Sequence, residues 1–129
     1  MQDPPSPDYM LGLIADFLRE ELMPKLSGSD AFDVRVCANA VDLVRRQLAL
    51  APATDAAERE SLQRLLGHDG ELEALNAELC ERIRDRKIDV STPGLLQHIR
   101  ALMLAKLEVD QPNYASYRRA KKTWGAEKA

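Results

Sequence analysis

The sequence predicts an all-α fold: a single-domain bundle of five helices, with room for a short sixth helix at the C-terminal end. Apolar residues recur at steps of three and four, whereas no segment alternates apolar and polar residues for the length of a strand. Proline and glycine residues divide the chain into segments of helix length. With 129 residues, 45% of them apolar and only 5% aromatic, the chain can form one core of mainly aliphatic side chains.

Capping residues and prolines set the bounds of the first two expected helices. Pro7 follows Ser6 and suits the first turn of a helix, where the missing N–H is not needed. Asp30 ends a loop of serine and glycine and can cap the second helix. Because Pro52 disfavours helical backbone in the residue before it, the second helix should end there. We therefore expect helices over residues 7–23 and 31–50.

The remaining helices show similar signals. Asp55 and Glu58 have the spacing of a capping box, and Gly67 suits the end of a helix. Thr92 is a candidate cap that is followed by Pro93 in the first helical turn. The expected helices cover residues 55–67, 71–86 and 93–109.

Polar residues within the apolar stripes form a candidate internal polar site that consists of Glu21, Asn76, Lys106 and Asp110. Glu21 lies four residues after Phe17, so α-helical spacing places it on the apolar face of the first helix. An unpaired charge in a core costs much free energy, so we predict that Glu21 and Lys106 form an ion pair. Two alternatives stay open: side chains near helix ends that reach water, and a ligand site.

A polar stripe on the second expected helix is a candidate surface for binding a partner or an anion. Arg35, Asn39 and Arg46 share this stripe with Asp42, beside a broad apolar arc that predicts a central, multiply packed helix. A guanidinium group binds carboxylates and phosphates through two parallel hydrogen bonds, which suits acidic groups of a partner. The alternative is a solvated face with ion pairs within the helix.

The chain shows no recognisable motif for catalysis, a cofactor or a metal. Ser61 does not lie in a nucleophile elbow, and there is no glycine-rich phosphate loop. Cys37 and Cys80 have neither CxxC spacing nor clustered histidines around them. His68 and His98 are interpreted as surface residues. We expect no metal and no cofactor, and a non-enzymatic protein is favoured over an enzyme.

Charge is distributed unevenly. The expected bundle domain, residues 1–113, carries 13 basic and 20 acidic residues, whereas residues 114–129 form a basic tail with five basic residues and one acidic residue. The tail mixes basic and aromatic residues, which would suit nucleic acid, but the net charge of −3 favours a helix lying against the acidic body of its own chain or of a second copy. Neither a secretory signal nor a membrane-spanning run is apparent, so we expect a cytoplasmic protein without a membrane partner.

Four helix motifs suggest a family. They are Phe17-Leu18-x-Glu20-Glu21-x-x-Pro24, Phe32-x-x-Arg35-Val36-x-Ala38-Asn39-Ala40, Leu72-x-x-Leu75-Asn76-x-x-Leu79-Cys80 and Leu104-x-Lys106-Leu107-x-x-Asp110-x-Pro112-x-Tyr114. They resemble a family of small bacterial proteins that is known only as a domain of unknown function. Its members are commonly encoded beside phosphotransferases resembling aminoglycoside kinases and beside acyl-CoA dehydrogenases. The chain departs from the family at Gln111, where asparagine is expected, and in its longer basic tail.

The resemblance implies a protein partner, namely a kinase-like or acyl-CoA-processing enzyme. We therefore predict a non-catalytic accessory or regulatory subunit. The alternative is a small-molecule-binding protein or weak enzyme that uses the internal polar site. Exposed apolar surface and a filled core would favour the first, whereas a cavity reaching Glu21, Asn76 and Lys106 would favour the second. A homodimer is compatible with both.

Overall fold

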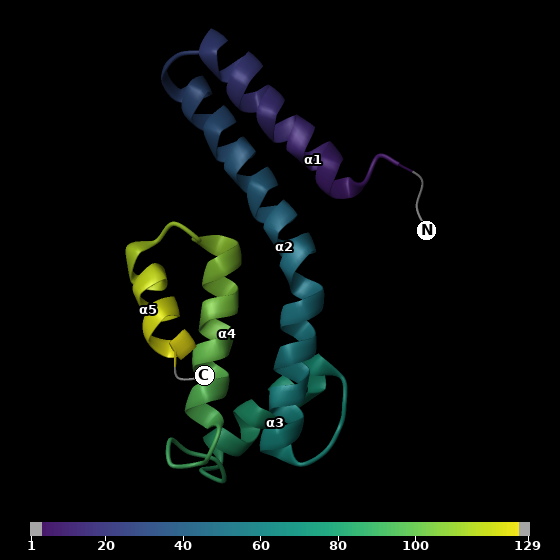
Figure 1. The fold of residues 1–129 in the computed structure, drawn as a ribbon, viewed down its shortest axis with the longest axis vertical. Helices are drawn as coiled ribbons and strands as arrows, with labels where there is room; N and C mark the ends of the chain where they lie inside the picture. Colours follow the sequence, from purple (N-terminus) through teal and green to yellow (C-terminus); the bar gives the residue numbers. More distant parts are fainter. Residues whose placement is uncertain (1–3, 127–129) are drawn as a thin grey trace. The chain divides into compact units, whose positions relative to one another are not determined.

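The structure is all-helical, as the sequence predicts. A computed structural model describes residues 4–126, and within this range it contains five α-helices and no β-strand (Figure 1). The chain divides into two compact units, one up to Leu50 and one from Ala51 onward. In the described range, no helix has both the length and the apolar character needed to cross a membrane.

The N-terminal unit is a hairpin of two helices that meet through small residues. α1 spans Pro7–Asp16 and begins where the Ser6 hydroxyl accepts a hydrogen bond from the Tyr9 backbone N–H at 3.3 Å. α2 spans Gly28–Leu66, and its first part belongs to this unit. The buried residues here are Gly12, Ala15 and Ala38. Because the spacing of packed helices depends on the side chains between them, these small residues allow a close approach.

A wide helical turn follows α1. Phe17–Leu22 form a π-helix and Met23–Lys25 a 3₁₀-helix, so helical backbone continues just past the predicted end. The Met23 N–H donates to the carbonyl of Leu18, five residues earlier. A π-helix has more residues per turn than an α-helix. Side chains after Phe17 therefore rotate away from the positions that α-helical spacing predicts.

α2 joins the second and third expected helices into one. Pro52 lies inside it, so the predicted break before this proline is wrong. Proline cannot donate a hydrogen bond to the carbonyl four residues earlier and usually bends a helix there. Ala49, Ala51 and Ala53 are strong helix formers on both sides, which offsets part of that cost. The boundary between the two units falls beside Pro52, between Leu50 and Ala51.

The C-terminal unit is built on a leucine-rich core. α3 spans Leu72–Arg84 and α4 spans Leu95–Asp110, each within two residues of the predicted bounds. The end of α2, α3 and the start of α4 contribute to this core, whose buried members are Leu62, Leu66, Leu75, Leu79, Ile88 and Leu95. Leu62 and Leu75 are the largest side chains that are fully buried in the described chain.

α4 begins two residues later than predicted, because Thr92 does not cap it. The Thr92 hydroxyl accepts a hydrogen bond from the Asp89 backbone N–H at 3.1 Å, and the Asp89 carboxylate accepts one from the Ser91 N–H at 2.8 Å. These bonds close a separate turn before the helix. Gly94, with a φ of 89°, then precedes the first helical residue, a left-handed conformation that glycine adopts without strain.

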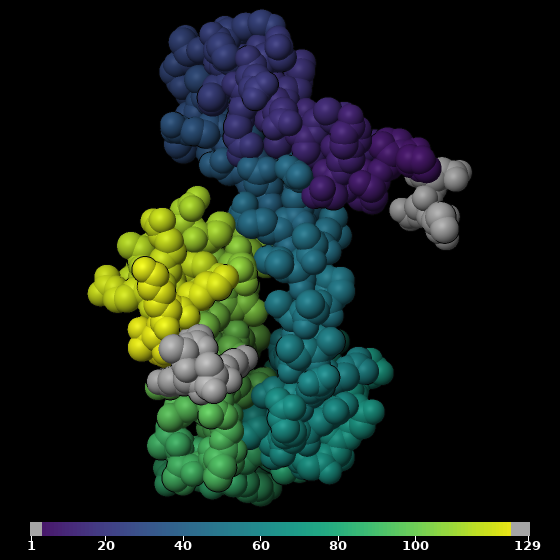
Figure 2. Space-filling model, viewed as in Figure 1, coloured from purple at the N-terminus to yellow at the C-terminus, as the bar shows by residue number. Residues whose placement is uncertain are grey.

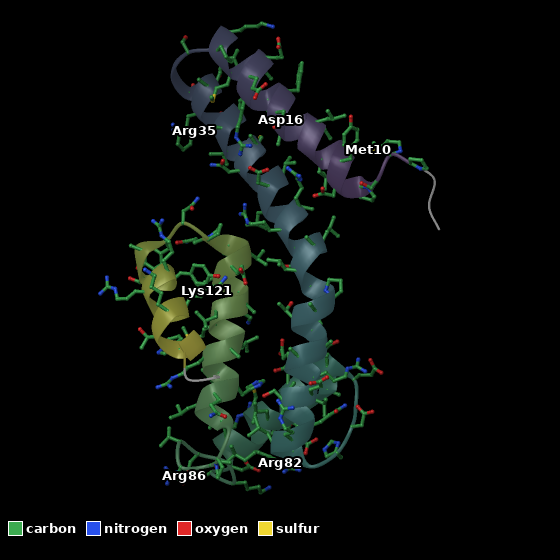
Figure 3. All side chains as sticks on the ribbon, in the orientation of Figure 1. Met10, Asp16, Arg35, Arg82, Arg86 and Lys121 are labelled. Atoms are coloured by element: carbon green, nitrogen blue, oxygen red, sulfur yellow. The ribbon has the colours of Figure 1, made fainter. Side chains whose placement is uncertain are left out.

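α5 corresponds to the short C-terminal helix that the sequence of the basic tail makes possible. It spans Ala115–Ala126 and contacts α4. Tyr117 is buried, and Lys121 Nζ lies 2.7 Å from Glu108 Oε1 of α4 (Figure 3). The tail helix thus lies against its own chain, which is the arrangement that the charge distribution favours.

We predict that Pro52→Ala stabilises the protein. Proline inside a helix is about 3 kcal/mol less favourable than alanine, and the greater freedom of the unfolded alanine chain offsets part of this gain. The free energy of unfolding in urea should rise by about 1–2 kcal/mol. Pro24→Ala is the matched control, since Pro24 lies in the first turn of the 3₁₀-helix, and should change little. A loss of stability in Pro52→Ala would show that the folded chain needs a bend there.

Candidate functional site

The two residues that were predicted to form an internal ion pair are both exposed. The Glu21 side chain is 64% exposed, and its carboxylate lies 3.8 Å from the Lys25 ammonium. Lys106 and Asp110 are exposed residues of α4 in the other unit. The prediction of a shared core position for Glu21 and Lys106 is therefore wrong. The π-helical turn rotates Glu21 outward, and the leucine core covers only the start of α4, about three turns before Lys106.

Asn76, the remaining member of the predicted polar site, is half-buried and forms hydrogen bonds within its own unit. Its Nδ2 donates to Glu58 Oε1 at 2.6 Å and to the Leu72 carbonyl at 3.2 Å. The first of these bonds links α3 to α2. Asn76 thus connects two helices, and the predicted internal site is not assembled around it.

Most of the polar stripe on α2 is engaged within the hairpin. Asn39 Oδ1 accepts a hydrogen bond from Arg19 Nη2 at 3.1 Å, and the same nitrogen lies 2.5 Å from Asp42. Arg46 is half-buried and also has an interaction partner. Arg35 is exposed, as Asn39 is, but its guanidinium lies over the Phe32 ring at the edge of the hairpin. These contacts leave Arg35 as the member of the stripe that is best placed to meet a partner.

The N-terminal hairpin exposes many large apolar side chains. Of sixteen exposed large hydrophobic residues in the described chain, ten lie in this unit. We call them the hairpin surface: Tyr9, Met10, Leu13, Ile14, Phe17, Phe32, Val36, Leu43, Val44 and Leu48. Arg35 borders it, with its guanidinium carbon 5.3 Å from the centroid of the Phe32 ring (Figure 3). The second expected helix, residues 31–50, was predicted to be packed on several sides. This is wrong, because Phe32, Val36 and Leu43 of its apolar arc are exposed.

The C-terminal unit contains a cleft of about 980 Å³ between α2, α4 and α5 (Figure 2). Alanines line its walls on two helices, Ala53 and Ala57 on α2 and Ala101 and Ala105 on α4. Their side chains are too small to fill the space, whereas leucines close the core at the end of α2. None of the four residues predicted for the internal polar site lines this cleft.

Tyr117 brings an unpaired hydroxyl to the cleft. Its side chain is 4% exposed, and its hydroxyl makes no hydrogen bond within the described chain. The Lys121 ammonium lies 5.6 Å from the ring centroid, and the pKa of Lys121 is raised by Glu108 first and by the nearby Tyr117 hydroxyl second. Lys121 is thus close to this hydroxyl without forming a hydrogen bond of normal geometry. A buried hydroxyl without a partner costs roughly 1–3 kcal/mol and calls for an explanation by water or ligand.

His98 is a second buried polar residue on the cleft, so its predicted surface position is wrong. It is 4% exposed, and its Nδ1 lies 3.0 Å from Ser61 Oγ on α2. Burial lowers the pKa of His98, and the negative charge of Glu58 opposes this shift without cancelling it. The imidazole is therefore mainly neutral at pH 7. Its place three residues after Leu95 and eleven before Val109 puts it on the buried face of α4.

The charged groups on the cleft compensate one another. Three are acidic and three basic: Glu58, Glu60, Glu108, Arg64, Arg100 and Lys121. Lys121 pairs with Glu108 at 2.7 Å, and the Arg100 guanidinium carbon lies 5.5 Å from the centroid of the Trp124 ring. The cleft therefore presents no excess charge to an ionic ligand.

The Ser61 and His98 pair is better suited to structure than to catalysis. Their separation resembles that of a nucleophile and its base. A catalytic serine also needs N–H donors for the developing oxyanion. Ser61 lies well inside α2, where backbone N–H groups are used by the helix itself. We therefore interpret the pair as a hydrogen bond that joins α2 to α4.

We predict that the pKa of His68 lies above the ordinary histidine value and that the pKa of His98 lies below it. The Asp69 carbonyl and the Glu78 carboxylate raise the pKa of His68, and burial lowers that of His98. In an NMR titration, His98 should thus lose its proton at lower pH than His68, with His68→Gln identifying the signals. The contribution of His98 to folding stability should fall as the pH drops below about 6.5, because the unfolded chain then binds a proton more readily. The contribution of His68 should be largest in that acidic range and should be lost as the pH rises. The reverse order would contradict the buried site.

Comparison with known proteins gives a family without an assigned activity. A family model described as "Domain of unknown function (DUF6285)" matches residues 24–114. This range contains α2, α3 and α4, which provide two of the three helices around the cleft, whereas α1 and α5 lie outside it. No curated protein and no solved structure matches the chain. Since the match covers well over half of the sequence, the chain belongs to the DUF6285 family of unknown function.

Proposed function

We propose that this protein is a non-catalytic accessory or regulatory subunit that binds a partner enzyme through the hairpin surface. The observation that carries the proposal is the exposure of large apolar side chains on both helices, while Gly12, Ala15 and Ala38 fill the contact between them. The sequence resemblance supports a kinase-like or acyl-CoA-processing enzyme as the partner, and we propose that the two act in the cytoplasm.

The exposed area is sufficient for a stable interface. The ten residues of the hairpin surface are each 37–58% exposed. At roughly 200 Å² for a large side chain, they present on the order of 1,000 Å². One side of a standard protein interface covers about 800 Å². A surface of this size in water therefore favours a protein partner.

The chemistry of the surface also limits what the partner can present. Two helices with apolar side chains at three- and four-residue steps suit another helical face, whose side chains can fit between theirs. Arg35 at the border, close to Phe32, adds a donor for a carboxylate of the partner. We infer an apolar helical face on the partner enzyme with an acidic residue at its edge.

We predict that a charge on the hairpin surface weakens the association without unfolding the protein. Leu13 and Val36 are 53% and 48% exposed, so Leu13→Glu and Val36→Glu should change the thermal midpoint little. A buried carboxylate at the interface should weaken binding at least about tenfold, or about 1.4 kcal/mol. The assay is co-purification with the enzymes encoded beside the gene, followed by calorimetric titration. Val90→Glu is the control, because Val90 is 76% exposed outside the hairpin.

Two outcomes would reject the accessory role. Unchanged affinity in both variants would show that the enzyme does not use this surface. Light scattering that shows a dimer of the chain, dissociated by Leu13→Glu, with no enzyme bound at any stage, would assign the hairpin surface to self-association instead.

We further predict that Arg35→Ala weakens binding to that enzyme by at least about 1 kcal/mol and leaves the thermal midpoint nearly unchanged. Arg35→Lys should restore little, because an ammonium lacks the fork of donors that a guanidinium offers to a carboxylate. Arg84→Ala, at an exposed arginine of α3, serves as the matched control. A large loss of folding stability in Arg35→Ala would instead make Arg35 a structural residue of the hairpin.

A further inference from the structure

The cleft of the C-terminal unit has the size and composition of a ligand site. Its volume of about 980 Å³ lies at the upper end of the ~300–1,000 Å³ that is usual for small-molecule sites. Ala57 and Ala101 keep two of its walls short, and Leu102, Leu104 and Trp124 add larger apolar surface. Polar side chains, among them Ser61, His98 and Tyr117, share the lining with these apolar residues and can orient a ligand.

The polar groups differ in how far their hydrogen bonds are satisfied. Ser61 and His98 bond to each other, Glu58 accepts from Asn76, and Lys121 is held by Glu108. The Tyr117 hydroxyl is the buried side-chain polar atom of the described residues that has no partner. Because it is 4% exposed and lines the cleft, the group that satisfies it has to enter the cleft.

The surroundings of Tyr117 indicate what that group must be. A phenolic hydroxyl can donate one hydrogen bond and accept others. The nearby Lys121 ammonium has only protons to offer, so it can approach the hydroxyl oxygen and cannot accept the hydroxyl proton. The hydroxyl proton of Tyr117 is therefore still free to be donated, and it needs an acceptor oxygen. Since the charges around the cleft cancel, a neutral carbonyl fits better than a carboxylate or a phosphate.

We propose that this cleft binds a neutral small organic molecule in which a carbonyl oxygen adjoins an apolar group, the oxygen accepting a hydrogen bond from Tyr117. The apolar group lies between the alanines of α2 and α4, and the indole of Trp124 covers one side. This site is separate from the hairpin surface, because all of its residues belong to the unit from Ala51 onward. Its function does not require a protein partner.

The chain provides a built-in reporter for this site. Trp124 is its only tryptophan and lines the cleft, so its indole N–H gives one signal in a ¹H–¹⁵N NMR spectrum of the intact protein. We suggest titration with acetophenone, a neutral aryl ketone. The Trp124 signal should shift and saturate, with a Kd of roughly 1 mM or tighter for a ligand of this size.

Two tyrosine variants test the hydrogen bond. Tyr117→Phe removes only the hydroxyl, and it should weaken acetophenone binding at least fivefold while the thermal midpoint of the unliganded protein stays the same or rises. This opposite effect on binding and stability is expected because the hydroxyl has no partner until ligand arrives. Tyr114→Phe is the matched control, since Tyr114 is 51% exposed and does not line the cleft, and it should bind as the natural chain does.

A filling variant and three analogues test the shape and the chemistry. Ala57→Leu should crowd the space between the alanines of α2 and α4 and reduce the shift of Trp124 in a protein that still gives a folded spectrum. Ethylbenzene, which lacks the carbonyl, should bind at least fivefold more weakly than acetophenone, and so should the charged phenylacetate and phenethylamine.

Three results would overturn the proposal. The first is the absence of a saturable shift at Trp124 in the natural chain. The second is equal binding by Tyr117→Phe, and the third is tighter binding of a charged analogue than of acetophenone. None of these results depends on the hairpin surface, so this proposal and the accessory role can fail independently.

Discussion

The leucine contact between the end of α2 and α3 is the interaction on which the C-terminal unit depends. Leu62 and Leu75 are fully buried, and Leu95 joins them from the first turn of α4, which holds α2 and α4 together at one end. One turn further along α4, the His98 and Ser61 hydrogen bond continues this contact. Beyond it, alanines of both helices line part of the space between them. The cleft therefore follows from the order of residue sizes along two helices that are fixed at one end.

The N-terminal hairpin lacks such a core, because the residues that it buries fully are small and its larger apolar side chains are at most half-buried. Burial of apolar area is the main favourable term in folding, and a unit of about fifty residues has little of it to spare. Here glycine and alanine are buried while leucine, valine and phenylalanine remain in water. Ion pairs such as Arg45 with Asp8 at 3.0 Å are partly exposed and add little. Association with another apolar surface would supply the burial that the hairpin lacks.

Local sequence signals predicted helices well and predicted their surroundings poorly. Ser6 and Gly67 mark real boundaries, because capping depends on nearby backbone groups. The predicted helix end before Pro52 was wrong, because the cost of one proline is small beside the hydrogen bonds of a helix of 39 residues. The predicted inward position of Glu21 was wrong, because the π-helical turn changes the direction of the side chains that follow Phe17. Which apolar stripe is buried depends on distant contacts, and periodicity alone cannot distinguish a core face from an exposed one.

The cleft residues show how a binding group differs from a structural one. His98 shares a face with Leu95 and Val109, and Tyr117 shares one with Lys121 and Trp124, so both positions could be found from spacing in the sequence. Their roles could not, because these depend on partners from other helices. His98 is satisfied by Ser61, so opening that bond for a ligand would return little free energy. Tyr117 is unsatisfied, so a carbonyl that reaches it removes an existing cost in addition to forming a bond. The asymmetry between these two buried polar groups is what makes the cleft more than a packing defect.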